Sequence, residues 1–367
     1  MPRWLNAGSE IDAASVFFPI PVTHRIKSAT ATVLFLLSGQ SFRRGRLGIQ
    51  RSFRFSVGNG GCLAYHQCSR NAQILDLVHV PDNLYPDFDG YPLLTDRRLL
   101  TISGPDAVAF AHAQFSSDVV ALADNHWHWS GWLTAKGRTI AVFQLLRLSS
   151  EELMLVCADP GVDEIASQLQ RFVFRRKVKI SLRDELQVRG AFRTTEAANG
   201  ATISAIGAET REIDMGSDAL PRVMRIGPAT APEGDADAVF TSAWRETDLR
   251  FGLPRLEPDQ REQWTPQQLG LDRLNGYSVK KGCYPGQEIV ARTHFLGKAK
   301  RALQLLQLSA AALPGDKVEQ DGAALGTIAC VAGELALAVL PLETSDATLS
   351  VGGTPAQRAA LLDGLAR

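Results

Sequence analysis

The first 75 residues of this 367-residue chain lack the sequence pattern of a globular domain, and this feature limits the folded part of the chain more than any other. No acidic residue lies between Asp12 and Asp76, and no sustained hydrophobic period of a strand or a helix is present there. The segment holds nine basic residues and two acidic ones. We therefore expect residues 1–80 to be an extension outside the fold, and the patterned sequence to begin near residue 91.

Two explanations fit an arginine- and serine-rich, acid-poor extension: an organellar transit peptide, or a start site placed too far upstream. We favour the second explanation. No Met occurs between Met1 and Met154, so a downstream start would use a non-Met initiator at Val78 or Val80. The expected location is then the cytoplasm, whereas a genuine transit peptide would direct the protein to the mitochondrial matrix.

The charge of the whole chain is zero, because 39 basic residues offset 39 acidic ones. This balance disfavours a general affinity for nucleic acid or membrane. The apolar run of residues 29–37 is only about half as long as a membrane-spanning helix requires, so no membrane partner is expected. The five cysteines are odd in number and lack the spacing of a disulfide framework, which is typical of a reducing compartment.

The body of the chain alternates strands with a few helices. Ser103 and Pro105 predict the start of a helix that ends near Phe115, with Ser103 as its cap. Residues 127–134 and 139–148 predict a hairpin, and residues 153–158 and 178–182 predict two further strands. Between those two strands, a helix is expected to bury Ile165, Leu169 and Phe172 on one face. Residues 190–238 give only weak strand signals, near residue 203 and at 223–226.

The C-terminal part predicts a small antiparallel β-barrel. Its short apolar segments, residues 303–308, 325–331 and 335–340, are separated by turns that contain glycine. A capping box at Thr265 and Gln268 predicts a short helix before the barrel, and residues 355–365 predict a last helix. The fold class expected is therefore α+β, with residues 91–298 as two intertwined subdomains and residues 299–367 as the barrel domain.

The densest motif is the string K-K-G-C-Y-P-G-Q-E at residues 280–288. Its glycines permit a tight backbone path, and its two lysines would favour the thiolate form of Cys283. Cys283 is therefore a candidate reactive or ligand-capable thiol. The alternative is that Cys283 is a small buried residue in a loop whose glycines serve only the turn.

This string, followed by V-A-R at residues 290–292, resembles the signature of the YgfZ family of folate-binding proteins. These proteins are relatives of the T-protein, the aminomethyltransferase of the glycine cleavage system. The resemblance covers residues 91–345, about two-thirds of the chain. It includes five further stretches: Leu99–Ala107, Gln114–Val119, Ala135–Arg138, Phe174–Val178 and Trp264–Asp272.

The resemblance implies a T-protein-like, multi-part ring around a central cavity for tetrahydrofolate or a derivative, with a terminal β-barrel. It also implies a role in assembly, repair or maintenance of [4Fe-4S] enzymes, including those that thiolate tRNA. The partners implied are folate and iron-sulfur enzymes or cluster assembly proteins, without a requirement for direct nucleic-acid binding. Carried over by position, Cys283 matches the family cysteine, and its frame is Lys281, Gly282, Tyr284, Gly286, Gln287, Glu288 and Arg292.

Trp244 falls where a family tryptophan contacts folate, although a core aromatic residue would look the same in the sequence. A second family tryptophan is replaced here by a residue near Arg97. The alternative function is a folate-dependent aminomethyltransferase or methyltransferase, which needs a carboxylate in the cavity. Ala141 and Val142 stand where the T-protein has its Asp-Asp pair, so we expect that this chain is not an active aminomethyltransferase.

Two weaker signals are also present. His126 and His128 lie on one face of a predicted strand, but no third ligand accompanies them, so no metal site is predicted. A basic run, Arg171, Arg175, Arg176, Lys177 and Lys179, could contact RNA or an acidic partner, although a solvated face is the simpler interpretation.

Overall fold

The computed structural model describes residue 88 and residues 90–229, 238–297, 299–343 and 348–367. All of them belong to one compact unit, residues 74–367. The predicted extension, residues 1–80, lies outside the described residues. None of the helices in the described part is long and apolar enough to cross a membrane.

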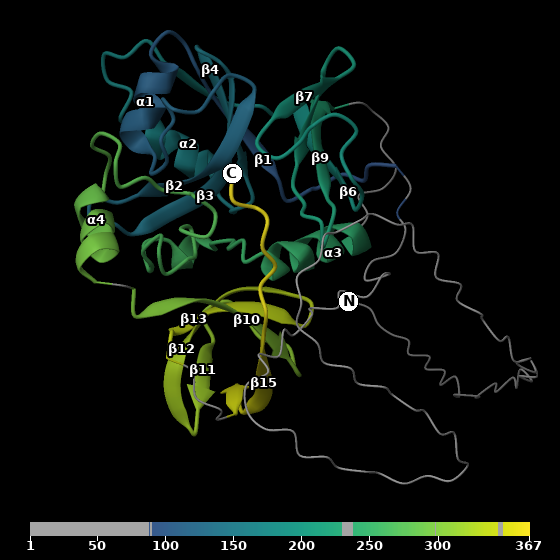
Figure 1. Cartoon of the computed structure of the whole chain (residues 1–367), viewed down its shortest axis with the longest axis vertical. Helices are drawn as coiled ribbons and strands as arrows, with labels where there is room; N and C mark the ends of the chain where they lie inside the picture. Colours follow the sequence, from purple (N-terminus) through teal and green to yellow (C-terminus); the bar gives the residue numbers. More distant parts are fainter. Residues whose placement is uncertain (1–87, 89, 230–237, 298, 344–347) are drawn as a thin grey trace, which may run out of the picture. The chain divides into compact units, whose positions relative to one another are not determined.

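The first layer is a five-stranded antiparallel sheet in the order β2-β3-β4-β1-β5 (Figure 1). Two helices, α1 and α2, pack on it. The bounds are β1 Arg98–Ser103, α1 Ala107–Gln114, β2 His126–Leu133, β3 Thr139–Ser149, β4 Glu152–Cys157, α2 Val162–Gln170 and β5 Lys179–Leu182. The predicted hairpin is formed by β2 and β3.

Strand β3 is buried on both faces, and its alternating side chains serve two different cores. Ala141, Phe143 and Leu145 face the core that holds α1 and α2. Val142 and Leu146 face a second core shared with α3 and the barrel. Because the side-chain period of a strand is two, neighbouring residues of one segment line two separate compartments.

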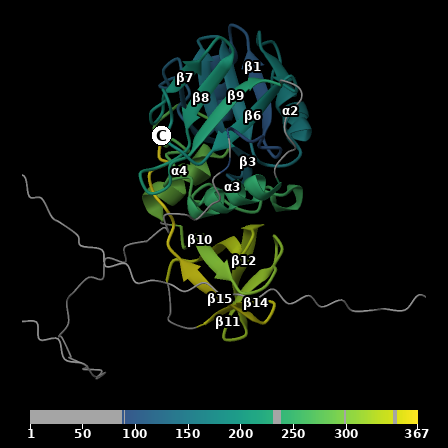
Figure 2. The same ribbon diagram turned by 90° about the vertical axis from the view of Figure 1, so that its right-hand side faces the viewer.

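A second antiparallel sheet, in the order β6-β9-β8-β7, is formed by the region with only weak strand signals in the sequence (Figure 2). Its strands are β6 Leu186–Ala191, β7 Ile203–Ile206, β8 Thr210–Asp214 and β9 Val223–Pro228, and α3 Ala238–Arg250 follows. A 3-10 turn, η1 Pro258–Gln260, and the helix α4 Gln287–Leu296 precede the barrel. Neither α3 nor α4 was expected from the sequence.

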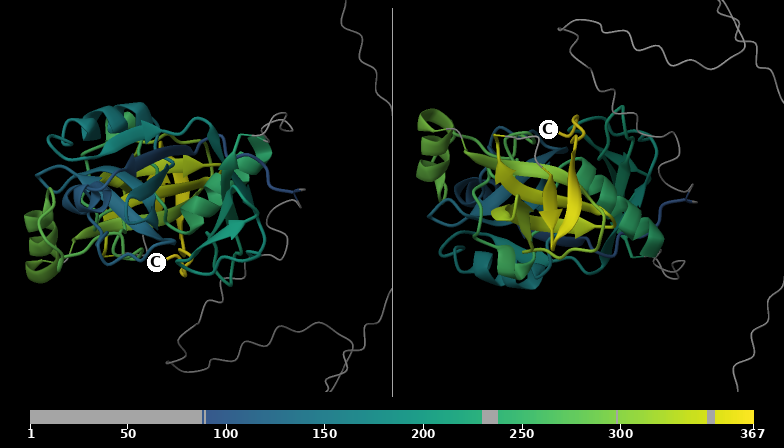
Figure 3. Two further views of the ribbon diagram at one scale, coloured as in Figure 1. Left: turned by 90° about the horizontal axis from the view of Figure 1, so that it is seen from above. Right: turned by 90° about the horizontal axis from the view of Figure 1, so that it is seen from below.

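The C-terminal strands close into a six-stranded barrel in the order β10-β13-β12-β11-β14-β15 (Figure 3). They are β10 Arg301–Leu308, β11 Lys317–Gln320, β12 Ala323–Ala332, β13 Leu335–Pro341, β14 Leu349–Val351 and β15 Thr354–Ala359. The prediction of an α+β fold with a C-terminal antiparallel barrel is confirmed. The domain limits proposed from the sequence stay predictions.

The helix predicted at residues 355–365 is wrong. Its first half is β15, which the barrel needs to close between β10 and β14. The last residues leave the barrel and lie against the first sheet, where the Trp129 Nε1–H donates to the Leu365 carbonyl at 2.9 Å (Figure 1). Leu362 and Leu365 are buried there.

Three local predictions also need correction. The capping box of Thr265 and Gln268 does form, but Gly270 adopts a left-handed conformation, φ +72°, so the segment makes successive turns instead of an α-helix. Ser103 belongs to β1 and does not cap α1. Phe172 lies beyond the end of α2 and is half exposed.

Candidate functional site

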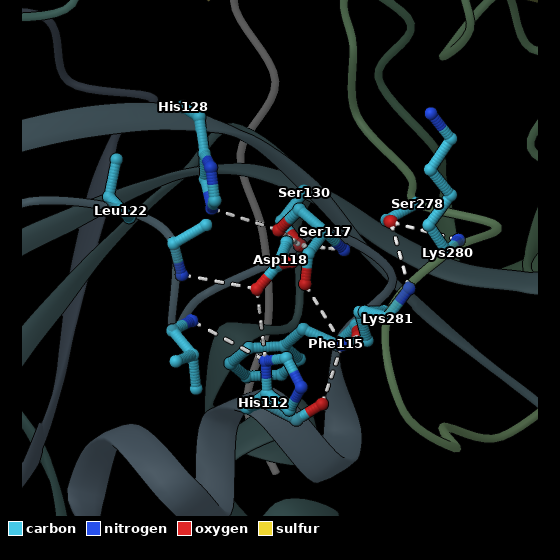
Figure 4. A network of polar contacts seen from close by, with 12 residues as sticks. His112, Phe115, Ser117, Asp118, Leu122, His128, Ser130, Ser278, Lys280 and Lys281 are labelled. Carbon is cyan, nitrogen blue, oxygen red and sulfur yellow. Dashed lines mark hydrogen bonds and ion pairs between the residues drawn. The ribbon is translucent and has the colours of Figure 1, made fainter.

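Lys281 anchors the motif loop to the end of α1. Its buried ammonium donates three hydrogen bonds, to the carbonyls of His112 (2.5 Å), Phe115 (2.5 Å) and Ser117 (2.9 Å), as Figure 4 shows. A cation at the carboxyl end of a helix also interacts favourably with the helix dipole. Burial lowers the pKa of Lys281 to about 8. With all three hydrogens donated to carbonyls, this ammonium holds the loop in place.

Gly286 brings the motif loop against the β2–β3 turn. Its φ is +79°, and a Cβ at this position would lie 2.6 Å from the Gly137 Cα and 2.6 Å from the Thr134 carbonyl oxygen. Gly137 is equally constrained, since its own Cβ would lie 2.8 Å from the Ile289 Cβ. The A-K-G-R turn and the cysteine motif therefore pack directly on each other.

Other motif residues fix the loop from within. The Tyr284 hydroxyl donates to the Ser278 carbonyl at 3.0 Å, and the Gln287 side-chain amide donates to the Lys281 carbonyl at 2.9 Å. Gln267, from the stretch of residues 264–272, donates to the Val290 carbonyl at 2.9 Å. Three of the five further stretches that carry the family resemblance, residues 114–119, 135–138 and 264–272, thus contact this motif.

Cys283 is exposed at the tip of this rigid loop, between the buried residues Lys281 and Tyr284. The interpretation of Cys283 as a small buried residue is therefore excluded. Glu288 and Arg292 are also exposed, on α4, whereas Gly282 has open space around it. The arrangement presents one accessible thiol from a fixed backbone.

A buried hydroxyl network lies beside the Lys281 anchor (Figure 4). The Ser117 hydroxyl lies 2.9 Å from His128 Nε2 and donates to the Ser130 hydroxyl at 2.6 Å. Burial, together with the charge of Lys281, lowers the pKa of His128 to about 4, so this imidazole is neutral at pH 7. His126, the other histidine of the pair, hydrogen-bonds with the Asp124 carbonyl instead.

A separate cavity opens between the first sheet, the end of α3 and the barrel strand β12. Its empty space, with the open mouth included, is about 760 Å³. Trp129 and Val142 supply apolar walls, and Gln144, Arg97 and Asp248 supply polar ones. Cys283 is not among the lining residues.

Charged side chains line one wall of the cavity in a buried network. Asp248 pairs with Arg97 and, at 2.8 Å, with Arg222. Asp96 pairs with Arg97 at 3.0 Å, with Arg245 at 2.8 Å and with Arg255 at 3.2 Å. Burial alone would raise the pKa of Asp96, but these guanidinium groups together lower it. One carboxylate oxygen of Asp96, Oδ1, is buried without a hydrogen-bond partner among the described residues.

Trp244 lies on α3 but is fully buried, with Arg222 stacked 4.7 Å from its ring. It packs so closely on β6 that a Cβ at Gly190 would lie 2.7 Å from its Cζ3 atom. Its neighbours Arg245 and Asp248 line the cavity, whereas Trp244 does not. The burial fits the core interpretation of this residue, and the folate contact stays a prediction. Trp244 and Cys283 are not brought together.

Val142, one of the two residues that the sequence resemblance sets against the T-protein Asp-Asp pair, lines the cavity, whereas Ala141 faces the opposite core. A carboxyl group does lie behind Val142: Asp159 accepts the Val142 N–H at 3.1 Å and the Leu256 N–H at 2.8 Å. Burial raises the pKa of Asp159 to about 6.

The sequence missed the arginine-carboxylate network, because its members come from four distant segments and none belongs to a motif. The only signal for it was the position near Arg97 where the family tryptophan is replaced. Within the described ranges, no group of three or more His, Cys, Asp or Glu residues could hold a metal ion.

Comparisons with known proteins agree with the motifs. No family model matches the chain. Proteins named tRNA-modifying protein YgfZ from Aliivibrio fischeri (strain MJ11) and Serratia proteamaculans are 27% and 29% identical to it, over 62% and 60% of this chain and 74% and 72% of theirs. The crystal structure of glycine cleavage system aminomethyltransferase T from Bartonella henselae matches 74% of this chain and 84% of that one, with a TM-score of 0.59. At 14% identity, this last likeness shows a shared fold alone.

Proposed function

We propose that this chain, which is similar to the YgfZ proteins and shares the T-protein fold, binds a folate in the cavity described above and assists [4Fe-4S] enzymes, including those that thiolate tRNA. The observation that carries the proposal is the pairing of two separate features. One is a cavity with apolar and charged walls, and the other is the Cys283 thiol, the one exposed cysteine among the described residues, on a loop fixed by hydrogen bonds.

The cavity fits the chemistry of tetrahydrofolate. The Trp129 and Val142 walls suit a flat ring, and the buried Asp96 Oδ1, an acceptor without a partner among the described residues, suits the amino and ring N–H groups of a pterin. Arg245 is partly exposed at the cavity and suits the carboxylates of the glutamate tail. When bound, the folate would supply one-carbon or redox chemistry; the chain supplies binding, orientation and charge.

Cys283 is the residue we assign to cluster or sulfur chemistry. Because Lys281 and Gly286 fix the loop, the thiol can approach a partner without rearrangement of the backbone. A single thiol suits transient ligation or sulfur exchange with a client protein. Direct binding of tRNA is not required, since the effect on tRNA can run through the thiolating enzymes.

The alternative, a folate-dependent aminomethyltransferase, is less well supported. Transfer of the one-carbon group needs a positioned carboxylate near the folate nitrogen, and Val142 occupies the corresponding wall. Among the described residues, three carboxylates line the cavity: Asp96 and Asp248 are paired with buried arginines, and Glu257, whose side chain is partly exposed, lies 3.8 Å from Arg255.

Titration of the purified full chain with tetrahydrofolate, followed by tryptophan fluorescence, tests the folate half of the proposal. We expect saturable binding that Gln144→Leu weakens by about tenfold, the effect of losing one hydrogen bond to a polar ligand. Gln304→Leu, in the barrel and outside the cavity lining, is the matched control and should bind like wild type. Absence of saturable binding by wild type would refute this half.

A further inference from the structure

An apolar groove starts two residues from Cys283. Its lining includes Trp132, Ile140 and Phe172 together with Pro285 of the motif loop. Successive Cα atoms are 3.8 Å apart, so the Cα of Cys283 lies within about 8 Å of the Cα of Pro285. A chain seated in the groove would therefore have its next residues beside the exposed thiol.

The groove has a preformed wall. Phe172 is half exposed, yet its ring packs edge-on against the buried Trp132, with ring centroids 6.1 Å apart. Beyond it, Phe174 is 76% exposed and carries the guanidinium of Arg175 over its ring at 5.1 Å. Phe172 and Phe174 thus expose two large aromatic rings to water within three residues, which is energetically unfavourable unless a partner covers them.

The rim of the groove is positively charged. Arg171 lines the groove itself, and Arg175, Arg176 and Lys177 follow it on the exposed segment between α2 and β5. Lys136, in the β2–β3 turn, is also exposed and directly follows Thr134 and Ala135, which line the groove. None of these five side chains forms an ion pair with another described residue. The cations are therefore available to a partner.

We propose that this groove docks an acidic segment of a client protein that carries an apolar anchor residue, and so delivers the client to Cys283. The anchor fills the space between Phe172 and Pro285, and the flanking acidic residues meet the arginines of the rim. The inference deepens the proposed function, on which it rests for the identity of the client, but it does not depend on the folate.

A peptide fits these features better than a nucleic acid does. The anchor position is a recess whose aromatic wall is held by Trp132, whereas single strands stack their bases on freely accessible rings. Residues 76–367 also carry a net charge of −7, from 30 basic and 37 acidic residues, which disfavours a long polyanion.

The test measures how fast Cys283 exchanges with a peptide disulfide. The protein is the full chain with Cys62→Ser and Cys68→Ser. Cys157 and Cys330 are kept because they are buried, so the thiol that reacts with the probe is that of Cys283. The probe is a short glutamate-rich peptide with a central Leu-Phe pair and one cysteine held as its mixed disulfide with thionitrobenzoate. The Cys283 thiolate attacks the peptide sulfur, forms the protein–peptide disulfide and releases one thionitrobenzoate, which is read by absorbance.

We expect the acidic peptide to react at least about tenfold faster than the same peptide with lysine in place of glutamate, because docking raises the effective concentration of the disulfide. Arg175→Glu with Arg176→Glu should reverse that preference, while Lys317→Glu, at another exposed cation on β11, should leave it unchanged. Phe172→Ala should slow the Leu-Phe peptide but not its Ala-Ala version.

Dithiodipyridine, a small neutral disulfide, reports the reactivity of the thiol alone and should react equally with every variant. Equal rates for all peptides, relative to this reagent, would overturn the proposal. A polyuridine oligonucleotide that displaces the acidic peptide and binds more tightly would overturn it in favour of single-stranded RNA. If peptide selectivity is present but Cys283→Ala has no effect on cluster enzymes in cells, the docking site stands and the proposed function fails.

Discussion

Replacement of Lys281 by methionine tests whether the motif lysine holds the Cys283 loop. Methionine fills a similar volume but removes the three hydrogen bonds to the carbonyls of His112, Phe115 and Ser117. Two of these acceptors, in Phe115 and Ser117, are in buried contacts, and an unsatisfied buried polar group costs about 1–3 kcal/mol. Relief of the buried charge offsets part of this cost, so we expect a loss of about 2–4 kcal/mol in the free energy of unfolding.

The assay is urea unfolding of the full chain. If the slope of the unfolding free energy against urea concentration is the same in both variants, the shift in the midpoint reports the change in stability. Lys280→Met is the matched control. Lys280 is exposed, and the buried contacts are made by the side chain of the next residue, Lys281. Its effect should stay within about 0.5 kcal/mol of wild type. Equal stability of the two variants would refute the anchoring role.

The remaining predictions concern the loop, the cavity network and pH. Gly286→Ala should destabilise the chain by about 2 kcal/mol or more, since it combines a left-handed φ with backbone atoms at 2.6 Å, whereas Gly282→Ala meets no atom closer than 4.0 Å and should be nearly neutral in thermal unfolding. Asp248→Asn should cost about 3–5 kcal/mol in urea unfolding, because it leaves Arg97 with a buried charge that has lost a partner. Because the pKa of Asp159 is raised, its carboxyl group binds a proton more tightly in the folded state than in the unfolded chain. The free energy of unfolding should therefore fall as pH rises from about 4 to about 6, and Asp159→Asn should lack that fall.

The sequence predicts those elements whose own residues carry the pattern. The hairpin of β2 and β3 and the barrel strands β10, β12 and β13 were predicted to within two residues, because their apolar and β-branched runs end at turns with glycine. Helix α3 was missed, since its buried positions include Thr241, Thr247 and Asp248 beside Phe240 and Trp244, so that no continuous apolar stripe marks the buried face. Residues 355–359 were misread as helix, because closure of the barrel selects a strand there.

The candidate site likewise has a part that the sequence predicts and a part that only the structure shows. Cys283 and its frame were found from one contiguous string, and the structure adds the reason for several of them: Lys281 binds carbonyls, and Gly286 touches Gly137. The cavity network could not be found in this manner. Arg97 and Asp248 are 151 positions apart, and only the fold brings them together.

The central claim is that Cys283 serves iron-sulfur enzymes and not one-carbon transfer. We would delete the gene in its host, restore wild type or Cys283→Ala, and assay a [4Fe-4S] tRNA-thiolating enzyme beside glycine cleavage flux in the same cells. We expect loss of the thiolating activity with Cys283→Ala, at normal protein level, and unchanged glycine cleavage. Full thiolating activity in the deletion strain, or a defect confined to glycine cleavage, would contradict it.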